Sequence, residues 1–184
     1  MVRLFIALLL PDEIKQALEQ LIIDFKPRGQ GIRWVAAKNM HLTLKFVGET
    51  TEDMIEPIGQ ALTTVLDGKQ SHVIKISGCG GFPNLKNPRV LWAGLDGAEP
   101  AAVMAKEIDE ELRRLGFPKE KRPLSPHLTL GRIKQRSDIS DLTTYMQSLT
   151  FTSEPITLDR VALVKSTLTP SGPIYENLKL FTLE

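Results

Sequence analysis

Two of the three histidines in this chain lie in identical tetrapeptides, and they are the residues best suited to chemistry. His41-Leu42-Thr43-Leu44 recurs as His127-Leu128-Thr129-Leu130, at an offset of 86 residues. Imidazoles can take a proton from one oxygen and give a proton to another, and threonine hydroxyls can donate to the other oxygens of a phosphate. The repeat therefore predicts one phosphate-handling site formed by His41, Thr43, His127 and Thr129.

The other residues with possible chemistry are weaker candidates. His72 has neither a Thr partner nor a duplicate, so we expect a solvated residue at the edge of a strand. The single Cys79 excludes a disulfide within the chain and is expected to be a small buried residue in a reducing compartment. Neither tetrapeptide offers a second ligand at metal-binding spacing, so no metal and no other cofactor is expected.

Side-chain alternation along a strand predicts which residues share the site. One face is expected to carry His41, Thr43 and Lys45, and the face packed against helices to carry Leu42, Leu44 and Phe46. Arg132 lies five residues after His127 and so falls on the opposite face, unless Gly131 permits a bulge that turns it into the site. There it would contact phosphate or base; otherwise it is a surface charge at a strand end.

Residues around the expected cleft could hold a nucleobase. Phe46 occupies the position equivalent to Arg132 in the first half, and the two could sandwich a base between them. Packing of Phe46 in the core is an equal alternative. Weaker candidates for the rim, each with a structural role favoured, are Trp34, Arg122 and Tyr175. Arg136, outside the second motif, is expected to matter less than Arg132.

Hydrophobic periodicity divides the chain into strands and helices that could position these residues. The expected strands are 3–10, 33–35, 41–47, 73–76, 89–95, 127–133, 157–164 and 178–183. The expected helices are 12–25, 50–66, 100–115 and 139–149. The glycine-rich segment 78–83 is expected to be a junction between lobes or, alternatively, a bulged hairpin.

The order of these elements predicts an α+β fold with two related lobes. Residues 3–9 and 89–95 also match at the offset of 86, which indicates an internal repeat of about 1–80 and 87–184 within one domain, 1–184. Each lobe is expected to be a mostly antiparallel sheet with two helices on its outer face. The active site then lies in the cleft between the lobes.

Composition limits the possible partners. The 184 residues are 42% hydrophobic and carry a net charge of +1, so the chain lacks the basic surplus expected for gripping long nucleic acid. A local basic cleft for a terminal phosphate is still compatible with this charge. The apolar run 2–10 is too short to span a membrane and is expected to be a buried strand. We expect a cytoplasmic protein without membrane contact, and a monomer.

The paired motifs resemble those of a known family. His41-Leu42-Thr43-Leu44-Lys45-Phe46-Val47-Gly48 and Pro126-His127-Leu128-Thr129-Leu130-Gly131-Arg132 are similar to the signatures of the two-histidine (2H) phosphoesterases, in the branch of RNA 2',3'-cyclic phosphodiesterases, also called 2'-5' RNA ligases. The resemblance extends over the whole chain, including 3–11, 89–94 and 165–175. It implies a bilobal fold with a metal-free cleft.

The resemblance also implies an activity and residue roles. RNA-terminal or nucleotide 2',3'-cyclic phosphates would be hydrolysed to 2'-phosphates, with His41 as general acid and His127 as general base. The expected partners are RNA ends, tRNA-type fragments among them, or small cyclic nucleotides. Two alternatives stay open, namely reversible 2'-5' RNA ligation at the same site and a non-catalytic module that binds RNA ends or nucleotides. Sequence symmetry alone does not decide which histidine is the acid.

Overall fold

The fold of this computed structural model is α+β, as expected, and it is described for residues 1–134, 138–170 and 172–184. The strands are β1 (Val2–Leu9), β2 (Ile32–Trp34), β3 (His41–Thr50), β4 (His72–Phe82), β5 (Val90–Asp96), β6 (His127–Ile133), β7 (Ile156–Leu158), β8 (Arg160–Thr169) and β9 (Gly172–Thr182). The α-helices are α1 (Asp12–Phe25), α2 (Ile55–Leu66), α3 (Glu99–Arg114) and α4 (Ser140–Ser148), and short 3-10 turns are η1 (Lys26–Arg28), η2 (Ala37–Asn39) and η3 (Glu52–Met54).

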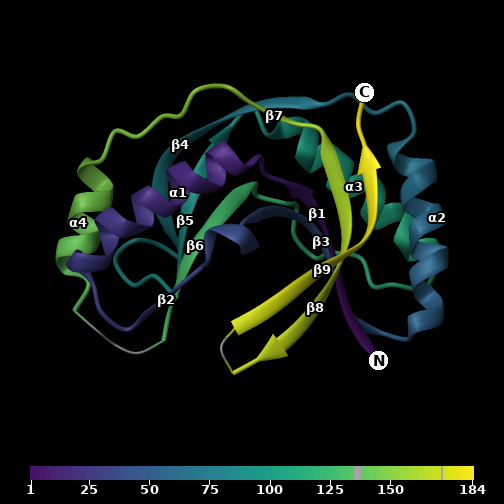
Figure 1. The fold of residues 1–184 in the computed structure, drawn as a ribbon, viewed down its shortest axis with the longest axis horizontal. Helices are drawn as coiled ribbons and strands as arrows, with labels where there is room; N and C mark the ends of the chain where they lie inside the picture. The colour runs from purple at the N-terminus through teal and green to yellow at the C-terminus, as the bar shows by residue number, and fades with distance from the viewer. Residues whose placement is uncertain (135–137, 171) are drawn as a thin grey trace.

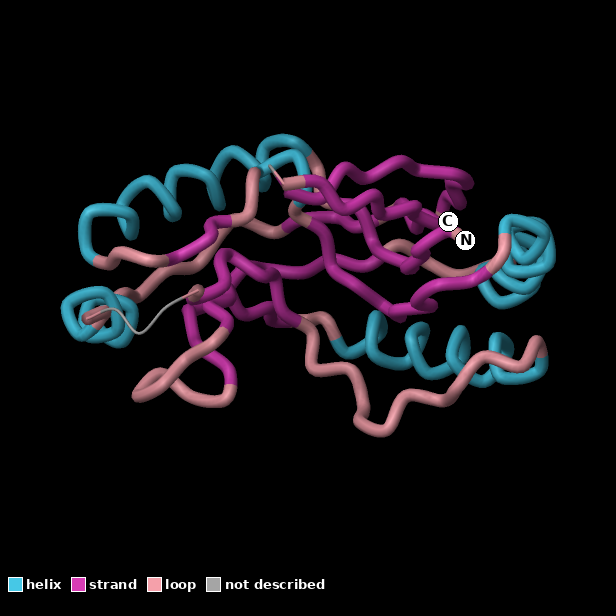
Figure 2. The backbone as a smooth tube through the Cα atoms, turned by 90° about the horizontal axis from the view of Figure 1, so that it is seen from below, coloured by secondary structure: helices cyan, strands magenta, loops and turns pink. Residues whose placement is uncertain are grey.

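Two antiparallel sheets form the middle of the molecule, and the helices lie around the outside (Figures 1 and 2). The first sheet has the strand order β3-β1-β8-β9, and the second has the order β2-β6-β5-β4-β7. Helices α2 and α3 contact each other beside the first sheet, while α1 and α4 lie beside the second (Figure 1). The expected arrangement of two sheets with outer helices is confirmed.

Each sheet is assembled from both halves of the sequence. Strand β4 does not close a unit with the first-half strands, because it pairs with β5 in the second sheet. Strand β8 in turn joins β1 in the first sheet. The single strand expected over 157–164 is wrong, since the chain leaves β7 in the second sheet and enters β8 in the first within two residues. The two lobes therefore exchange strands.

The glycine-rich segment is part of a bulged hairpin and not a junction between lobes. Residues 78–82 continue β4, which pairs with β5 from Lys75 to Phe82. Between Ile76 and Cys79 the register shifts, because Ser77 and Gly78 of β4 oppose the single residue Gly94 of β5. Gly80 allows the ring of Trp92 to lie against the strand, since a Cβ there would be 2.1 Å from the indole. The second of the two expectations is the correct one.

Strands β1 and β5 are structurally equivalent at a different offset from the one that their sequence similarity suggests. Leu9 pairs with His41, and Gly94 pairs with His127. Structurally equivalent positions in β1 and β5 are thus 85 residues apart (94 − 9), and the offset of 86 holds for the histidine motifs only. Sequence similarity between two strands does not reveal this shift of one residue. The shift reverses the face of the sheet on which each side chain lies.

One main core joins the two sheets to the helices. On the helix-facing side of β3 and β6, Leu42, Leu44, Leu128 and Leu130 are all buried, as expected. A smaller cluster on the opposite face of the first sheet contains Phe5, Ala7, Ala162 and Val164, with Leu9 and Tyr175 packed against it. No helix in the described part of the chain has the length and apolar character needed to cross a membrane.

Candidate active site

A β-bulge follows the first histidine motif and decides which side chains reach the site. Ala7 pairs with Thr43 and Ile6 with Lys45, so Leu44 is the extra residue in β3. Lys45 consequently turns into the helix layer and is only 3% exposed, whereas Phe46 is 61% exposed. The expected faces of Lys45 and Phe46 were wrong, and so was core packing of Phe46, because simple alternation ends at the bulge.

The second motif carries the same bulge. Trp92 pairs with Thr129 and Leu91 with Gly131, so Leu130 is the extra residue in β6. Arg132 is exposed and pairs with Val90, two residues before Trp92 on the same face of β5. The bulge expected beside Gly131 is therefore present, and Arg132 shares a face with Thr129. Phe46 and Arg132 occupy corresponding places after the two motifs.

The two motif strands lie next to each other where the sheets meet. Strands β3 and β6 are in contact, although they belong to different sheets. Tyr175 of β9 in the first sheet has its pKa raised by burial, and the nearby positive charges of Arg132 and Arg3 oppose this rise. Arg132 of the second sheet is thus close enough to act electrostatically on a first-sheet side chain. The structure brings both motifs and Arg132 to one region.

His41 is held in a fixed orientation on the first sheet. Its ring stacks on Phe5 at 4.7 Å between centroids and meets the edge of Tyr175 at 5.4 Å. Nδ1 lies 2.8 Å from the carbonyl oxygen of Asn39, which can only accept, so Nδ1 carries a hydrogen and Nε2 is the atom available to a ligand. Burial lowers the pKa of His41 to about 4, partly offset by the Asn39 carbonyl.

His127 repeats this arrangement on the second sheet. Its Nδ1 donates to the carbonyl oxygen of Ser125 at 2.8 Å, again two residues before the histidine. The edge of Phe82 packs on the ring at 4.9 Å. Both imidazoles therefore present Nε2, with the tautomer set by a backbone carbonyl in each case. The hydroxyls of Thr43 and Thr129 are half-buried and have no hydrogen-bond partner among the described residues.

A buried ion pair supports the first motif from behind. The Lys45 ammonium is 2.5 Å from Asp109 of α3 and also donates to the carbonyl oxygen of Pro118 at 3.0 Å. Asp109 accepts in addition from the backbone N–H of Glu120. This contact ties the bulge of β3 to a helix from the second half of the chain. It also ties the bulge to the loop that leads toward His127.

Sequence reasoning missed several of these residues. Phe5 packs on His41, and Phe82 packs on His127. The internal repeat does not align these two phenylalanines with each other. Tyr175 was expected only as a weak candidate, yet it contacts His41 directly. Asp109 lies in a helix rich in charged residues, and nothing in the sequence distinguishes it from its exposed neighbours. The parity of strand faces would have identified Phe5 once its pairing with Phe46 was known.

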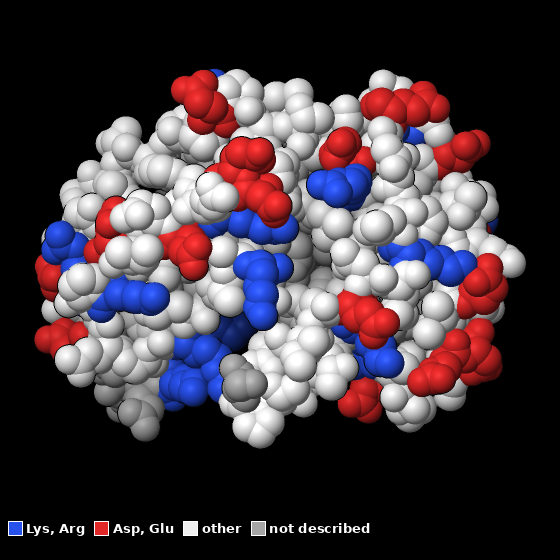
Figure 3. Space-filling view, in the orientation of Figure 1, with Lys and Arg blue, Asp and Glu red and all other residues white. Residues whose placement is uncertain are grey.

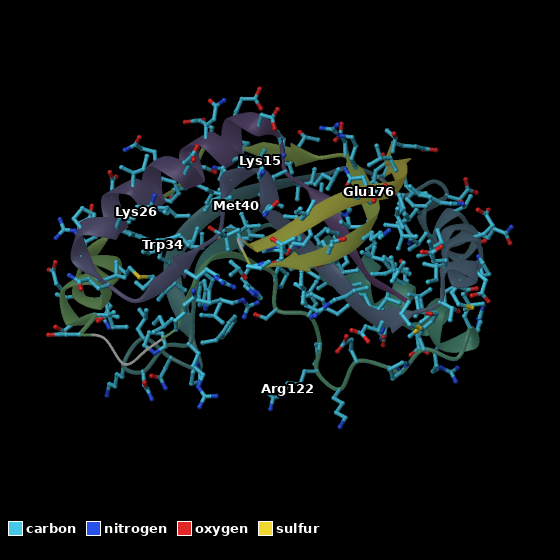
Figure 4. All side chains as sticks on the ribbon, turned by 60° about the horizontal axis from the view of Figure 1, so that its bottom comes forward. Lys15, Lys26, Trp34, Met40, Arg122 and Glu176 are labelled. Carbon is cyan, nitrogen blue, oxygen red and sulfur yellow. The ribbon has the colours of Figure 1, made fainter. Side chains whose placement is uncertain are left out.

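Other candidates lie away from the site. Trp34 packs against Phe25 on the core side, at 6.3 Å between ring centroids. Arg122 lies exposed on the loop before β6, away from Lys15 and Met40 (Figure 4). Arg136 falls outside the described residues. His72 is buried and not solvated, because β7 covers the start of β4 by pairing with it.

The remaining titratable groups offer neither a reactive thiol nor a cluster for a metal. Burial raises the pKa of Cys79 to about 12, which keeps the thiol protonated near neutral pH. Across residues 1–134, 138–170 and 172–184, no three His, Cys, Asp or Glu side chains gather in a way that could hold a metal ion. The arrangement at the two motifs can instead transfer protons at two points and donate hydrogen bonds between them.

Comparison with known proteins agrees with this arrangement. The family model described as LigT like phosphoesterase matches residues 8–92 and 95–175. The chain belongs to the LigT like phosphoesterase family. It is 37% identical to the RNA 2',3'-cyclic phosphodiesterase of Methanocaldococcus jannaschii, over 96% of this chain and 98% of that protein. It is 35% identical to the protein of the same name from Thermotoga maritima, over 96% and 92%.

Two solved structures share the fold. TT0787 of Thermus thermophilus matches with a TM-score of 0.83 and 28% identity, covering 98% of this chain and 97% of that one. Escherichia coli LigT in its complex with 3'-AMP matches with a TM-score of 0.75 and 24% identity, covering 99% and 98%. Two lobes built from antiparallel sheets are thus common to this chain and to both structures.

Proposed function

We propose that this protein hydrolyses 2',3'-cyclic phosphates at RNA ends or on nucleotides and leaves a 2'-phosphate. The observation that carries the proposal is the matched setting of two imidazoles, each with Nδ1 bonded to a backbone carbonyl and Nε2 available, beside two unpartnered threonine hydroxyls in the described structure. The names of the relatives from Methanocaldococcus jannaschii and Thermotoga maritima support the substrate class.

The reaction needs only proton transfers and charge stabilisation. Water attacks phosphorus while Nε2 of His127 takes one of its protons, and the P–O3' bond breaks as Nε2 of His41 protonates O3'. The phosphate stays on O2'. Thr43 and Thr129 donate to the non-bridging oxygens, and Arg132 offsets their negative charge. None of these steps calls for a metal or another cofactor.

The low pKa of His41 places a condition on its role as the acid. With a pKa of about 4, the ring is almost entirely neutral near pH 7 in the protein alone. A bound phosphate provides the negative counter-charge that favours the imidazolium, and this raises the pKa of His41 in the complex. Substrate binding therefore brings with it the protonation that the leaving oxygen requires.

A product assay tests this function. Adenosine 2',3'-cyclic phosphate is incubated with the protein in excess EDTA, and phosphorus NMR identifies the product. We expect adenosine 2'-phosphate. Binding without turnover would instead identify a non-catalytic module, and a predominant 3'-phosphate would overturn His41 as the acid.

A ligation reaction would use the same site with a different nucleophile. A 5'-hydroxyl in the place of water would attack the cyclic phosphate and form a 2'-5' linkage, with the two histidines in the same roles. Adding a 5'-hydroxyl oligonucleotide to the assay measures this activity directly. We propose hydrolysis as the main reaction, because water is in large excess over any RNA 5'-hydroxyl.

A further inference from the structure

A cavity of about 310 Å³ opens beside His41, on the side of the first sheet. Residues of β1 and β8 next to His41 form its floor. Its walls are the β8–β9 hairpin and the segment before β3. The residues that line it include Lys15, Lys38, Asn39, Met40, His41 and Asn177. The cavity therefore extends from His41 over β1, β8 and β9, whereas β6 with His127 adjoins β3 at the other end of the sheet.

The polar groups around the cavity favour an anion. Lys15 and Lys38 supply two positive charges, and Asn39 and Asn177 supply amides, while none of the described lining residues is an aspartate or glutamate. Lys15 contacts Asp12 at 3.2 Å, but this carboxylate is 85% exposed, and exposed pairs of this kind are weak. Lys38 has no carboxylate within ion-pair distance in the part of the chain that is described.

The walls of the cavity are held in place next to His41. The Asn39 side chain donates to the carbonyl oxygen of Pro173 at 3.1 Å, which joins the segment before β3 to the hairpin. The Asn39 backbone in turn accepts from His41. Figure 4 shows Lys15 on α1 near Met40, and Figure 3 shows Lys and Arg side chains gathered between α1 and the hairpin. The lysines are thus placed around a preformed space.

We propose that this cavity binds the last nucleotide of an RNA chain and that Lys15 and Lys38 contact the phosphodiester that joins it to the preceding nucleotide. The proposal rests on the proposed function with His41 as the acid. O3' and O2' belong to the same ribose, so protonation of O3' by His41 places the terminal nucleoside on the His41 side of phosphorus. Its 5' phosphodiester then lies farther into the same side, toward the lysines.

The size of the cavity agrees with one nucleotide. Small-ligand sites measure about 300–1,000 Å³, and this cavity is at the lower limit of that range. The rest of an RNA chain would have to leave past the lysines. The site is therefore expected to distinguish a chain end, which has a 5' phosphodiester, from a nucleoside cyclic phosphate, which has none.

The test compares two substrates and three forms of the protein. The substrates are adenosine 2',3'-cyclic phosphate and the dinucleotide ApA with a 2',3'-cyclic end. The proteins are the wild type, Lys15→Met/Lys38→Met and, as a control that removes a lysine elsewhere, Lys26→Met, whose exposed side chain lies on η1 outside the cavity. The ratio of kcat/KM for the dinucleotide to kcat/KM for the mononucleotide measures recognition of the phosphodiester.

We expect the wild-type ratio to be about ten or more, because a charge-assisted hydrogen bond contributes about a factor of ten. The double variant should bring the ratio close to one, and Lys26→Met should keep the wild-type ratio. The salt dependence of kcat/KM for the dinucleotide should become shallower by about 0.7 in log–log slope for each phosphate that the variant no longer binds.

The outcomes separate this proposal from the proposed function. Turnover of neither substrate by the wild type would contradict the function itself. Turnover of both substrates with a wild-type ratio near one, or with a ratio that the double variant leaves unchanged, would overturn the lysine subsite while the hydrolase activity stands.

Discussion

At the scale of single residues, the two histidines have equivalent hydrogen bonds but different surroundings. Phe5 and Tyr175 both pack on the ring of His41, whereas Phe82 alone packs on the ring of His127 among the described aromatic contacts. Burial accordingly lowers the pKa of His41 to about 4. A repeat that is symmetrical in sequence thus places its two histidines in different surroundings, and this difference can assign separate roles to two identical side chains.

Removal of either imidazole should abolish most turnover. We expect His41→Ala and His127→Ala each to lower kcat by about two to four orders of magnitude, since each removes one proton-transfer partner. The double variant should be scarcely slower than either single variant, because the two residues act as a unit. Steady-state kinetics on adenosine 2',3'-cyclic phosphate measures these effects.

The third histidine provides the control for this experiment. His72 is buried at the start of β4, away from both motifs in the strand order, so His72→Ala should keep kcat even if the protein becomes less stable. Wild-type kcat in His41→Ala or His127→Ala, with an unchanged circular dichroism spectrum, would exclude that residue from the mechanism.

The pH dependence should report the burial of His41. The kcat/KM profile follows the free enzyme, so one of its limbs should reflect His41 and lie near pH 4, not near the usual histidine value of about 6.5. Phe5→Ala would admit water to the ring, ease the desolvation of the charged form, and raise this pKa. The limb that reflects His41 should then move to higher pH.

The matching substitution on the other histidine controls for the removal of an aromatic ring. Phe82→Ala deletes the ring that packs on His127 and should leave the limb near pH 4 in place. NMR titration of the His41 ring protons, assigned by their disappearance in His41→Ala, gives the same pKa independently. A His41 titration at about pH 6.5 in the wild type would contradict the role given to burial.

At the scale of elements, the bulges after the two motifs connect the site to the core. Leu44 and Leu130 are extra residues that let two successive side chains face the helices, so that Phe46 and Arg132 return to the site. In β3 the inward position is taken by Lys45, whose charge is compensated by Asp109. The helix α3 therefore helps to fix the strand that carries His41 and Thr43.

Breaking this ion pair should be costly for stability. Asp109→Ala leaves the Lys45 ammonium buried without a carboxylate, a change that costs about 3–5 kcal/mol. For a chain of this size the loss corresponds to a decrease in Tm of about 6–20 °C. Combining Lys45→Met with Asp109→Leu should recover part of the stability, because no unpaired charge is left buried.

An exposed ion pair on the same helix shows what an ordinary contact contributes. Arg114 and Glu111 are 2.6 Å apart, but the arginine side chain is 71% exposed. Glu111→Ala should change the free energy of unfolding by less than about 1 kcal/mol. Equal thermal shifts for Asp109→Ala and Glu111→Ala would show that Lys45 and Asp109 do not form the buried pair described above.

The two histidine motifs are easier to recognise in the sequence than the assembly of the fold. His41, Thr43, His127 and Thr129 are visible because their types repeat in a pattern that packing does not require. Lys45 and Phe46 were placed on the wrong faces, since one extra residue in a strand changes side-chain direction without changing composition. The aromatic contact of Tyr175 with His41 depends on long-range pairing, which local patterns do not specify.

At the scale of the whole molecule, the same limit applies to the two halves. Periodicity predicted strands at 73–76 and 157–164, but not that β4 pairs with β5, that the second segment divides into β7 and β8, or that β8 pairs with β1. Each half of the sequence consequently contributes strands to both sheets. The internal repeat describes how the sequence is arranged, whereas each folded lobe requires both copies.

This exchange predicts that neither half folds alone. A chain ending at Lys86 would contain β1 and β3 without β8 and β9, and its β4 would lack β5. A chain beginning at Asn87 would contain β8 without its partner β1. Each fragment would expose apolar surface that the intact protein buries, and that burial is the main force for folding. We expect little ordered structure by circular dichroism and no cooperative thermal transition from either fragment.

Co-expression of the fragments tests whether the failure comes from missing partners or from the cut itself. The cut falls in the exposed turn between β4 and β5, so it removes no sheet hydrogen bond. The two fragments together should therefore form a complex with measurable turnover of adenosine 2',3'-cyclic phosphate, at lower stability than the intact chain, because bringing two chains together costs translational freedom. A cooperative thermal transition from residues 1–86 in isolation would show that the first half builds its own lobe, and it would contradict the exchange of β4 and β8 between the sheets.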